Sequence, residues 1–275
     1  MKKCLSVLLF VLCMVCVVTA MAETSGDYEY TVLEDGTAQI TKFHGNGALV
    51  TVPQALEGNA VTAIGDAAFQ SCTRLMNVVL PDGVTTIGEN AFASCTKLAS
   101  VTIPDSVTAI GDYAFTGCTG LNNVNIPEGI TILGDGTFSY CDSLEGIQLP
   151  DSIMVIGEGA FAHSGLKSLT IPRGVTVLGK QAFYNCGYLT SVTLPDTLTV
   201  LGDSLFYSCG KLTGITIPDS VTTIGERAFA YCYGLTDMII PDSVTEIGNG
   251  AFIYCRGMTN LKLSNALTEI GASMF

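Results

Sequence analysis

A 23-residue repeat constrains this chain more than any other feature. Proline recurs eight times at a step of 23 residues, except for one step of 22 between Pro150 and Pro172. Phenylalanine and glycine keep the same period over ten units, ending at Phe275 and Gly271. Self-similarity at such a period indicates stacked structural units rather than one globular core. We therefore predict that residues 48–275 form a solenoid of about ten coils, the last one incomplete.

One repeat contains the signals for two short strands and a turn. Leu98–Ile103 alternates apolar and β-branched residues and predicts a strand, which Pro104 ends because it has no amide to donate. Val107–Ile110 predicts a second short strand, and Gly111 permits a tight corner. Asp112–Cys118 predicts a single helical turn that begins with an acidic residue. Each coil is therefore expected to contain a strand, a turn, a short strand, a corner and a helical turn.

The consensus L-x-x-V-x-I-P-D-S-V-T-x-I-G-x-x-A-F-x-x-C resembles the BspA-like leucine-rich repeats of bacterial surface proteins. The resemblance covers about residues 48–275. It implies a right-handed solenoid with a parallel β-sheet ladder on one face, which with the helical turns would be of the α/β class. The resemblance also implies an exported protein, because members of the family are mostly exported. Some of them are implicated in adhesion and host-protein binding. It supplies no catalytic residues, so we expect no enzyme activity.

The first 22 residues have the pattern of a cleavable signal peptide. Lys2 and Lys3 precede an apolar run, Leu5–Val18, and small residues stand at the expected cleavage site after Ala22. A membrane anchor is the competing interpretation, but the run is shorter than the ~20 residues of a spanning helix. We predict a secreted or cell-surface protein with no membrane span in the mature chain.

Residues 23–47 are expected to form a β-hairpin cap on the first coil. Asp35-Gly36 lies between two alternating β-rich runs, which is a strong hairpin signal. A cap is needed because the first coil would otherwise expose its apolar side. The chain stops at Phe275 within a repeat and without a polar closing segment, so we also expect that it belongs to a longer sequence.

Eight cysteines share one position of the repeat. An even number in an exported protein favours disulfides, but residues in equivalent positions have parallel Cβ vectors that suit a disulfide poorly. We favour free buried thiols and leave disulfides or a metal as alternatives. The eight are Cys72, Cys95, Cys118, Cys141, Cys186, Cys209, Cys232 and Cys255.

Acidic residues form two rows, one after the proline and one after the glycine of most repeats. A calcium ladder would need several converging oxygen ligands for each ion, and one acid per coil in each row is too few. Turn and helix-start chemistry explains both rows. We predict no metal and no cofactor. The formal net charge of −13 also argues against nucleic acid as a partner.

Two surfaces are candidates for binding. The first is the outward side of the predicted strands, which is either a solvated β-face or a recognition surface. Its candidate residues are Ser100, Thr102, Asn123, Asn125, Gln148, Ser168, Thr170, Ser191, Thr193 and Thr216. The second is a tyrosine flank beside the predicted helical turn, either an interface or half-buried packing. Its residues are Tyr184, Tyr207, Tyr231 and Tyr254.

The 22-residue repeat is the one irregular unit. Ser164 replaces the repeat cysteine, and one residue is missing before Leu166. His163 has no matching nucleophile or acid in the repeat, so we interpret this unit as a local irregularity or a binding notch.

The sequence therefore predicts a non-enzymatic, exported and monomeric repeat protein that binds a protein or glycan partner. The alternative is a structural spacer that presents another domain beyond Phe275.

Overall fold

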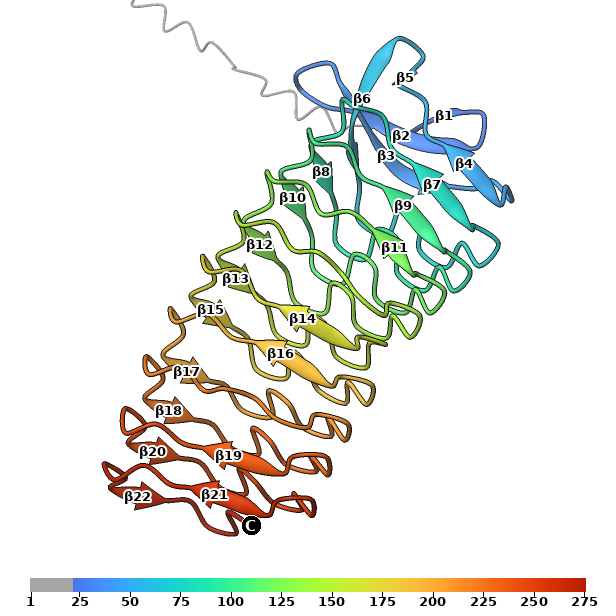
Figure 1. Ribbon diagram of the computed structural model, residues 1–275. Helices are drawn as coiled ribbons and strands as arrows, with labels where there is room; N and C mark the ends of the chain where they lie inside the picture. Colours follow the sequence, from blue (N-terminus) through green and yellow to red (C-terminus); the bar gives the residue numbers. More distant parts are fainter. Residues whose placement is uncertain (1–21) are drawn as a thin grey trace, which may run out of the picture.

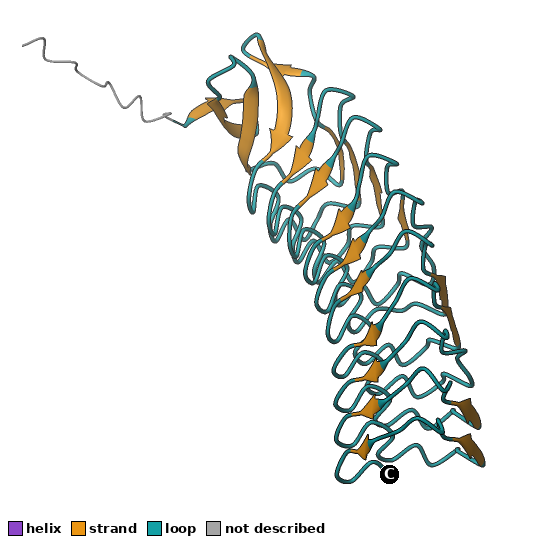
Figure 2. Ribbon diagram, turned by 90° about the vertical axis from the view of Figure 1, so that its left-hand side faces the viewer, coloured by secondary structure: helices purple, strands orange, loops and turns teal. Residues whose placement is uncertain are grey.

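The computed structural model describes residues 22–275, so the predicted signal peptide lies outside the described residues except for Ala22. The coils stack into an elongated, gently curved rod with the chain end at its tip (Figure 1). Two rows of short strands run along the rod, as Figure 2 shows from the side. The protein is a parallel-strand β-solenoid of about ten turns, as the repeat period predicts.

Three antiparallel strands open the fold. They are β1 (Glu23–Ser25), β2 (Tyr28–Val32) and β3 (Ala38–Phe43). Asp35 and Gly36 lie in the turn between β2 and β3. β3 then pairs in parallel with β6 (Asn59–Ile64), while β5 (Ala55–Leu56) pairs with β6 in antiparallel orientation. The backbone ladder of this first segment therefore continues directly into the coils.

The first row contains the strand that precedes the proline of each coil. Equivalent residues pair across coils, so that Val78 lies beside Val101. The strands of this row are β4 (Leu49–Thr51), β7 (Asn77–Val79), β9 (Ser100–Thr102), β11 (Asn123–Val124), β14 (Ser168–Thr170), β16 (Ser191–Thr193), β19 (Asp237–Ile239) and β21 (Asn260–Lys262).

The second row contains the short strand that precedes the repeat glycine. It begins at β6 and keeps the same one-repeat register, with Ile64 beside Ile87. Its further strands are β8 (Thr86–Ile87), β10 (Ala109–Ile110), β12 (Ile132–Leu133), β13 (Val155–Ile156), β15 (Val177–Leu178), β17 (Val200–Leu201), β18 (Thr223–Ile224), β20 (Glu246–Ile247) and β22 (Glu269–Ile270).

The first row is interrupted in two coils, at residues 146–148 and 214–216. In both coils glycine stands at the first outward strand position, as Gly146 and Gly214. Glycine weakens a strand because it loses the most conformational freedom and has no side chain to pack. The row therefore divides into three separate ladders, β4–β7–β9–β11, β14–β16 and β19–β21.

Restoring a side chain at one break should stabilise the protein. A Cβ atom on Gly214 would have no heavy atom within 4 Å. We expect Gly214→Thr to raise the free energy of unfolding by about 0.5–1 kcal/mol, because threonine favours extended backbone and glycine does not. Urea unfolding measures the change, and amide exchange at Ile215 and Thr216 should slow. Gly36→Thr is the control, since φ of +81° at Gly36 should make that substitution destabilising. Unchanged exchange in Gly214→Thr would contradict the explanation.

The predicted helical turns are not helices, and the α/β class is not confirmed. No helix forms within residues 22–275. In the segment Gly111–Cys118 the amides of Ala114, Thr116 and Cys118 donate to carbonyls three residues earlier. The amides of Tyr113, Phe115 and Gly117 donate instead to the next coil, at distances of 2.7–3.0 Å. Helical bonding is therefore replaced by overlapping β-turns that form a third inter-coil ladder, here called the turn ladder.

Left-handed backbone accompanies these turns. Tyr113 has φ of +56° and Gly117 has φ of +70°, each at the third residue of a turn, where type II turns require positive φ. An α-helix needs negative φ throughout, so these two residues exclude it. The same two positions have positive φ in most other coils.

The core consists of columns of equivalent residues. The nine repeat phenylalanines from Phe69 to Phe252 are at most 1% exposed. Neighbouring rings of this column stack with centroids 5.0–5.8 Å apart. Phe43 of β3 joins the column at 4.9 Å from Phe69. Burying each phenylalanine contributes about 1.5–3 kcal/mol, so the column is a large share of the force that holds the coils together.

Candidate functional site

The outward strand residues lie on the surface, as their alternation with buried residues predicts. Val101, Leu169 and Val192 are buried, while nine of the ten candidate residues are exposed and Ser100 is half-buried. The structure nevertheless divides this face. Gln148 and Thr216 belong to the two coils without a first-row strand.

Some polar side chains of the strand face also take part in stacking. The Asn125 side chain accepts from the Ile103 amide at 3.2 Å and donates to the Ile103 carbonyl at 2.8 Å. The Asn77 side chain donates to the Ser100 hydroxyl. These groups have partners within the chain, so they are less free to contact a ligand than the exposed threonines.

The tyrosine flank is larger than the sequence suggested. The rings of Tyr184 and Tyr207 stack with centroids 4.8 Å apart, and those of Tyr231 and Tyr254 lie 4.9 Å apart. Two further rings extend the row, because Tyr140 and His163 stack at 4.3 Å. We call the whole row the aromatic strip; it contains Tyr140, His163, Tyr184, Tyr207, Tyr231 and Tyr254.

The strip changes column twice. Tyr140, His163, Tyr231 and Tyr254 directly precede the cysteine position of their coils, whereas Tyr184 and Tyr207 stand one residue earlier. Two of the three pairs in the same column are close to parallel, with interplanar angles of 10° for Tyr140 and His163 and 6° for Tyr184 and Tyr207, whereas Tyr231 and Tyr254 are tilted by 31°. The angle is 48° between His163 and Tyr184 and 53° between Tyr207 and Tyr231. At these two tilted junctions, here called wedges, the neighbouring rings meet at an angle and not face to face.

A surface cavity lies at each wedge. The cavity at the first wedge has a volume of 550 Å³ and is lined by His163, Tyr184, Gln181 and Glu158 among others. The cavity at the second wedge has a volume of 410 Å³ and is lined by Tyr207, Tyr231, Arg227 and Ser204 among others. Gln181 and Tyr184 line both cavities, so the two are neighbours along one continuous flank.

Two side chains of the strip, His163 and Tyr207, have shifted pKa values. Partial burial lowers the pKa of His163, although Asp142 opposes this shift. The His163 Nδ1 atom lies 3.0 Å from the Asn185 side-chain amide. Burial, followed by the neighbouring Tyr231 and Tyr184, raises the pKa of Tyr207. Both shifts favour the uncharged form, of the His163 imidazole and of the Tyr207 hydroxyl.

All eight repeat cysteines are free thiols, and six of them are buried. Seven thiols donate to the phenylalanine carbonyl of the preceding coil, as Cys141 does to Phe115 at 3.3 Å. The neighbouring Cys118 thiol and burial raise the pKa of Cys95 to about 12. Burial also raises the pKa of Cys141 and of Cys232. The thiols with raised pKa values are therefore poor nucleophiles that act as packing groups. Cys186 differs, because burial opposes the shift but hydrogen bonds with Cys209 and Ser164 lower its pKa.

The raised thiol pKa values predict instability in alkali. Between the unfolded pKa, near 9, and the higher folded pKa, the folded state retains protons that the unfolded state releases. The free energy of unfolding should therefore fall as the pH rises above about 9, by up to ~1.4 kcal/mol per pH unit and thiol. Urea unfolding at pH 8, 9 and 10 measures this slope. Cys232→Ala should make the slope shallower, and an unchanged slope would contradict the prediction.

Acidic side chains of the row after the repeat glycine accept hydrogen bonds from backbone amides. Asp66, Asp112, Asp135 and Asp203 each accept a hydrogen bond from the amide one repeat later, at 2.7–2.9 Å. Each carboxylate thereby joins one coil to the next. Within residues 22–275, no three His, Cys, Asp or Glu side chains converge on a point that could hold a metal ion.

The 22-residue coil packs closely against the preceding coil. A Cβ atom on Gly165 would lie only 2.1 Å from the Asp142 carbonyl oxygen. In this shortened coil the position therefore requires glycine. Ser164 is buried with its hydroxyl 3.5 Å from Cys186 Sγ. Beside this coil lies an 830 Å³ cavity lined by the ion pair Lys167–Glu145, at 2.6 Å, and by Tyr188 with Lys211 over its ring.

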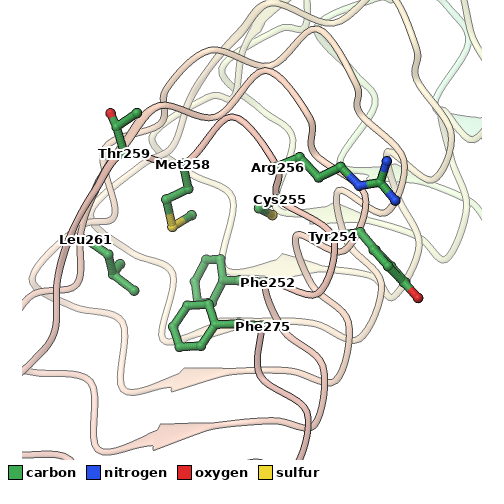
Figure 3. Close-up of a pocket in the computed structure, with 8 residues that line it drawn as sticks. All are labelled: Phe252, Tyr254, Cys255, Arg256, Met258, Thr259, Leu261 and Phe275. Carbon is green, nitrogen blue, oxygen red and sulfur yellow. The ribbon is translucent and has the colours of Figure 1, made fainter.

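A further cavity lies at the last coil. Its lining includes Phe252, Cys255, Met258, Leu261 and Phe275 (Figure 3). Phe275 continues the phenylalanine column, with its centroid 6.4 Å from that of Phe252. Tyr254 and Arg256 point outward from this group. The cavity is therefore the end of the core rather than a separate site.

Sequence reasoning found four of the six strip residues. It missed Tyr140, which lies outside the late tyrosine cluster, and it placed His163 only in a repeat that was either a local irregularity or a binding notch. The signal that could have found them is their position directly before the cysteine column, which Tyr231 and Tyr254 share. No helix of the described region is both long enough and apolar enough to span a membrane.

Comparison with known proteins gives a consistent result. A family model described as "BspA type Leucine rich repeat region (6 copies)" matches residues 62–190 and 176–275. Among solved structures, a Leucine Rich Repeat protein of T. pallidum is 32% identical, with coverage of 78% of this chain and 90% of that chain and a TM-score of 0.55. A leucine-rich repeat protein from Eubacterium ventriosum is 23% identical, with coverage of 90% of this chain and 73% of that chain and a TM-score of 0.55. The pneumococcal vaccine antigen PcpA is 16% identical, with coverage of 90% of this chain and 82% of that chain and a TM-score of 0.59. No significant match was found among curated proteins.

Proposed function

Because the chain belongs to the BspA type leucine-rich repeat family, in which a binding or scaffold role is general, we propose that it is an exported, non-enzymatic binding protein. It acts as a monomer at the cell surface or outside the cell, where it binds a protein or glycan partner. Support for export comes from the signal-peptide pattern of residues 1–22.

The observation that carries the proposal is the aromatic strip. Tyr140 is 51% exposed and Tyr254 is 45% exposed, although the phenylalanine column already supplies the aromatic core. A contiguous row of partly exposed rings is typical of interaction surfaces, and tyrosine is enriched in binding hot spots. The two cavities at the wedges provide the concave surface that a ligand needs. The exposed threonines of the strand face form a second, flatter surface for a large partner.

A direct test uses residues 23–275 against immobilised extracellular-matrix proteins and mucins. We expect saturable binding to at least one of them, and loss of binding in Tyr207→Ala/Tyr231→Ala. Tyr188→Ala is the matched control, because Tyr188 is 57% exposed but lies outside the strip. Absence of saturable binding, or equal loss in the control, would overturn the proposal.

The second candidate function is a spacer. The unbroken phenylalanine column and the turn ladder join every coil to the next, which suits a stiff rod that holds another domain away from a surface. A negative result in the binding test would favour this function.

A further inference from the structure

We propose that the aromatic strip binds a proline-rich segment in the polyproline II conformation, with one proline in each wedge. This inference rests on the proposed binding function and specifies its ligand. The strip combines tilted aromatic rings, two adjoining cavities and several polar side chains along one flank.

The spacing of the wedges matches this ligand. The first wedge lies between the coils of His163 and Tyr184, and the second lies two coils further, between those of Tyr207 and Tyr231. Coils separated by the usual inter-strand distance place the wedges roughly 10 Å apart. A polyproline II helix rises ~3.1 Å per residue with three residues per turn, so equivalent residues recur every ~9.3 Å. Two prolines separated by two residues would therefore reach both wedges on the same side of the peptide.

The ring geometry explains why the wedges would take a proline more readily than the parallel pairs. Within the pairs Tyr140–His163 and Tyr184–Tyr207 the rings are nearly parallel, so each covers the inner face of the other. At the wedges the rings are tilted by 48° and 53°, and a flat apolar ring can contact an aromatic face. Aromatic-lined grooves are a general means of binding proline-rich segments.

The polar groups of the strip complement such a peptide. A polyproline II helix has no internal hydrogen bonds, and proline lacks an amide, so the ligand presents mainly carbonyl acceptors. The flank presents donors in the tyrosine hydroxyls, the Gln181 amide and the Arg227 guanidinium. Gln181 lines both cavities, so it is placed to bond the peptide between the two prolines.

Charge gives the peptide a direction. Glu158 lines the first cavity, and Arg227, which also pairs with Glu226 at 3.2 Å, lines the second. A basic residue next to the proline in the first wedge would lie near Glu158. The formal net charge of −13 for the whole chain favours a basic ligand over an acidic one.

The test uses residues 23–275 and two fluorescent 12-residue peptides of identical composition. One contains Pro-Ala-Ala-Pro beside an arginine, and the other contains Pro-Ala-Ala-Ala-Pro, which moves the second proline out of register. Fluorescence anisotropy should show saturable binding of the first peptide and binding at least about tenfold weaker for the second. Tyr184→Ala and Tyr207→Ala should each weaken the first peptide about tenfold or more, whereas Tyr188→Ala should leave its affinity unchanged. Circular dichroism verifies that each variant is folded.

Three results would overturn the inference. They are no saturable binding of the first peptide, equal binding of both peptides, or equal weakening by Tyr188→Ala. A hexamer of β-1,4-linked N-acetylglucosamine is tested in parallel. If this hexamer binds in a Tyr207-dependent manner and the peptide does not, the strip is a glycan site, and the proposed binding function stands while the proline assignment falls.

Discussion

Replacing Phe183 by alanine should lower the free energy of unfolding by about 3–5 kcal/mol. Phe183 is completely buried and lies between Phe161 and Phe206, with ring centroids at 5.7 and 5.4 Å. The substitution removes two stacking contacts and leaves a cavity at the interface of three coils. Urea unfolding followed by far-ultraviolet circular dichroism measures the effect.

The control for Phe183→Ala is Tyr188→Ala, which removes an aromatic ring of similar size that is exposed. We expect a change within about 0.5 kcal/mol for Tyr188→Ala. Repeat arrays can unfold in steps, so tyrosine fluorescence should be recorded with circular dichroism to verify that the transitions coincide. A loss below about 1 kcal/mol in Phe183→Ala would show that the phenylalanine column does not hold the stack together.

Gly179→Ala should destabilise the protein by about 3 kcal/mol or more. A Cβ atom on Gly179 would lie 2.4 Å from the Gly157 carbonyl carbon and 2.5 Å from the Glu158 amide nitrogen. Both are backbone atoms of the preceding coil, so the clash is relieved only by separating the two coils. Thermal unfolding and yield of folded protein measure the effect.

Gly187→Ala is the matched control for this substitution. A Cβ atom on Gly187 would meet no heavy atom within 4 Å, and its backbone is not left-handed. We expect unchanged or slightly higher stability, by up to about 1 kcal/mol, because alanine restricts the unfolded chain. Equal destabilisation by both substitutions would contradict the view that the glycine column exists for close approach of the coils.

The period of the sequence predicted the strand rows and their register, because both depend on equivalent residues meeting across coils. Val101 and Ile110 lie inward in β9 and β10 as alternation requires. The helical turn was wrong for a reason that local sequence does not reveal. Phe115 and Cys118 share a face in a helix and in a β-turn alike, and the difference is that the Phe115 amide donates to Thr137 of the next coil.

The candidate site was predictable in composition but not in geometry. The column of each ring could be read from the sequence, yet the tilt between His163 and Tyr184 arises from a one-residue shift between neighbouring coils. The effect of this shift on the angle between the rings depends on how the coils stack. The breaks at Gly146 and Gly214 could have been predicted, since glycine inside a strand weakens it.

The turn ladder has a consequence for how such a protein can change in length. Each of its bonds joins an amide to the carbonyl of the residue just before its equivalent one unit away, as the Tyr113 amide does to Asp135. A duplication or loss of one whole 23-residue unit would therefore create no new kind of contact and should be tolerated during evolution. The wedges behave differently, because their separation counts coils. Loss of the Tyr207 coil would place Tyr184 directly before Tyr231. The two wedges would then lie one coil apart instead of two. The number of units can therefore vary without loss of inter-coil contacts, whereas the peptide site proposed above requires the wedges to lie two coils apart.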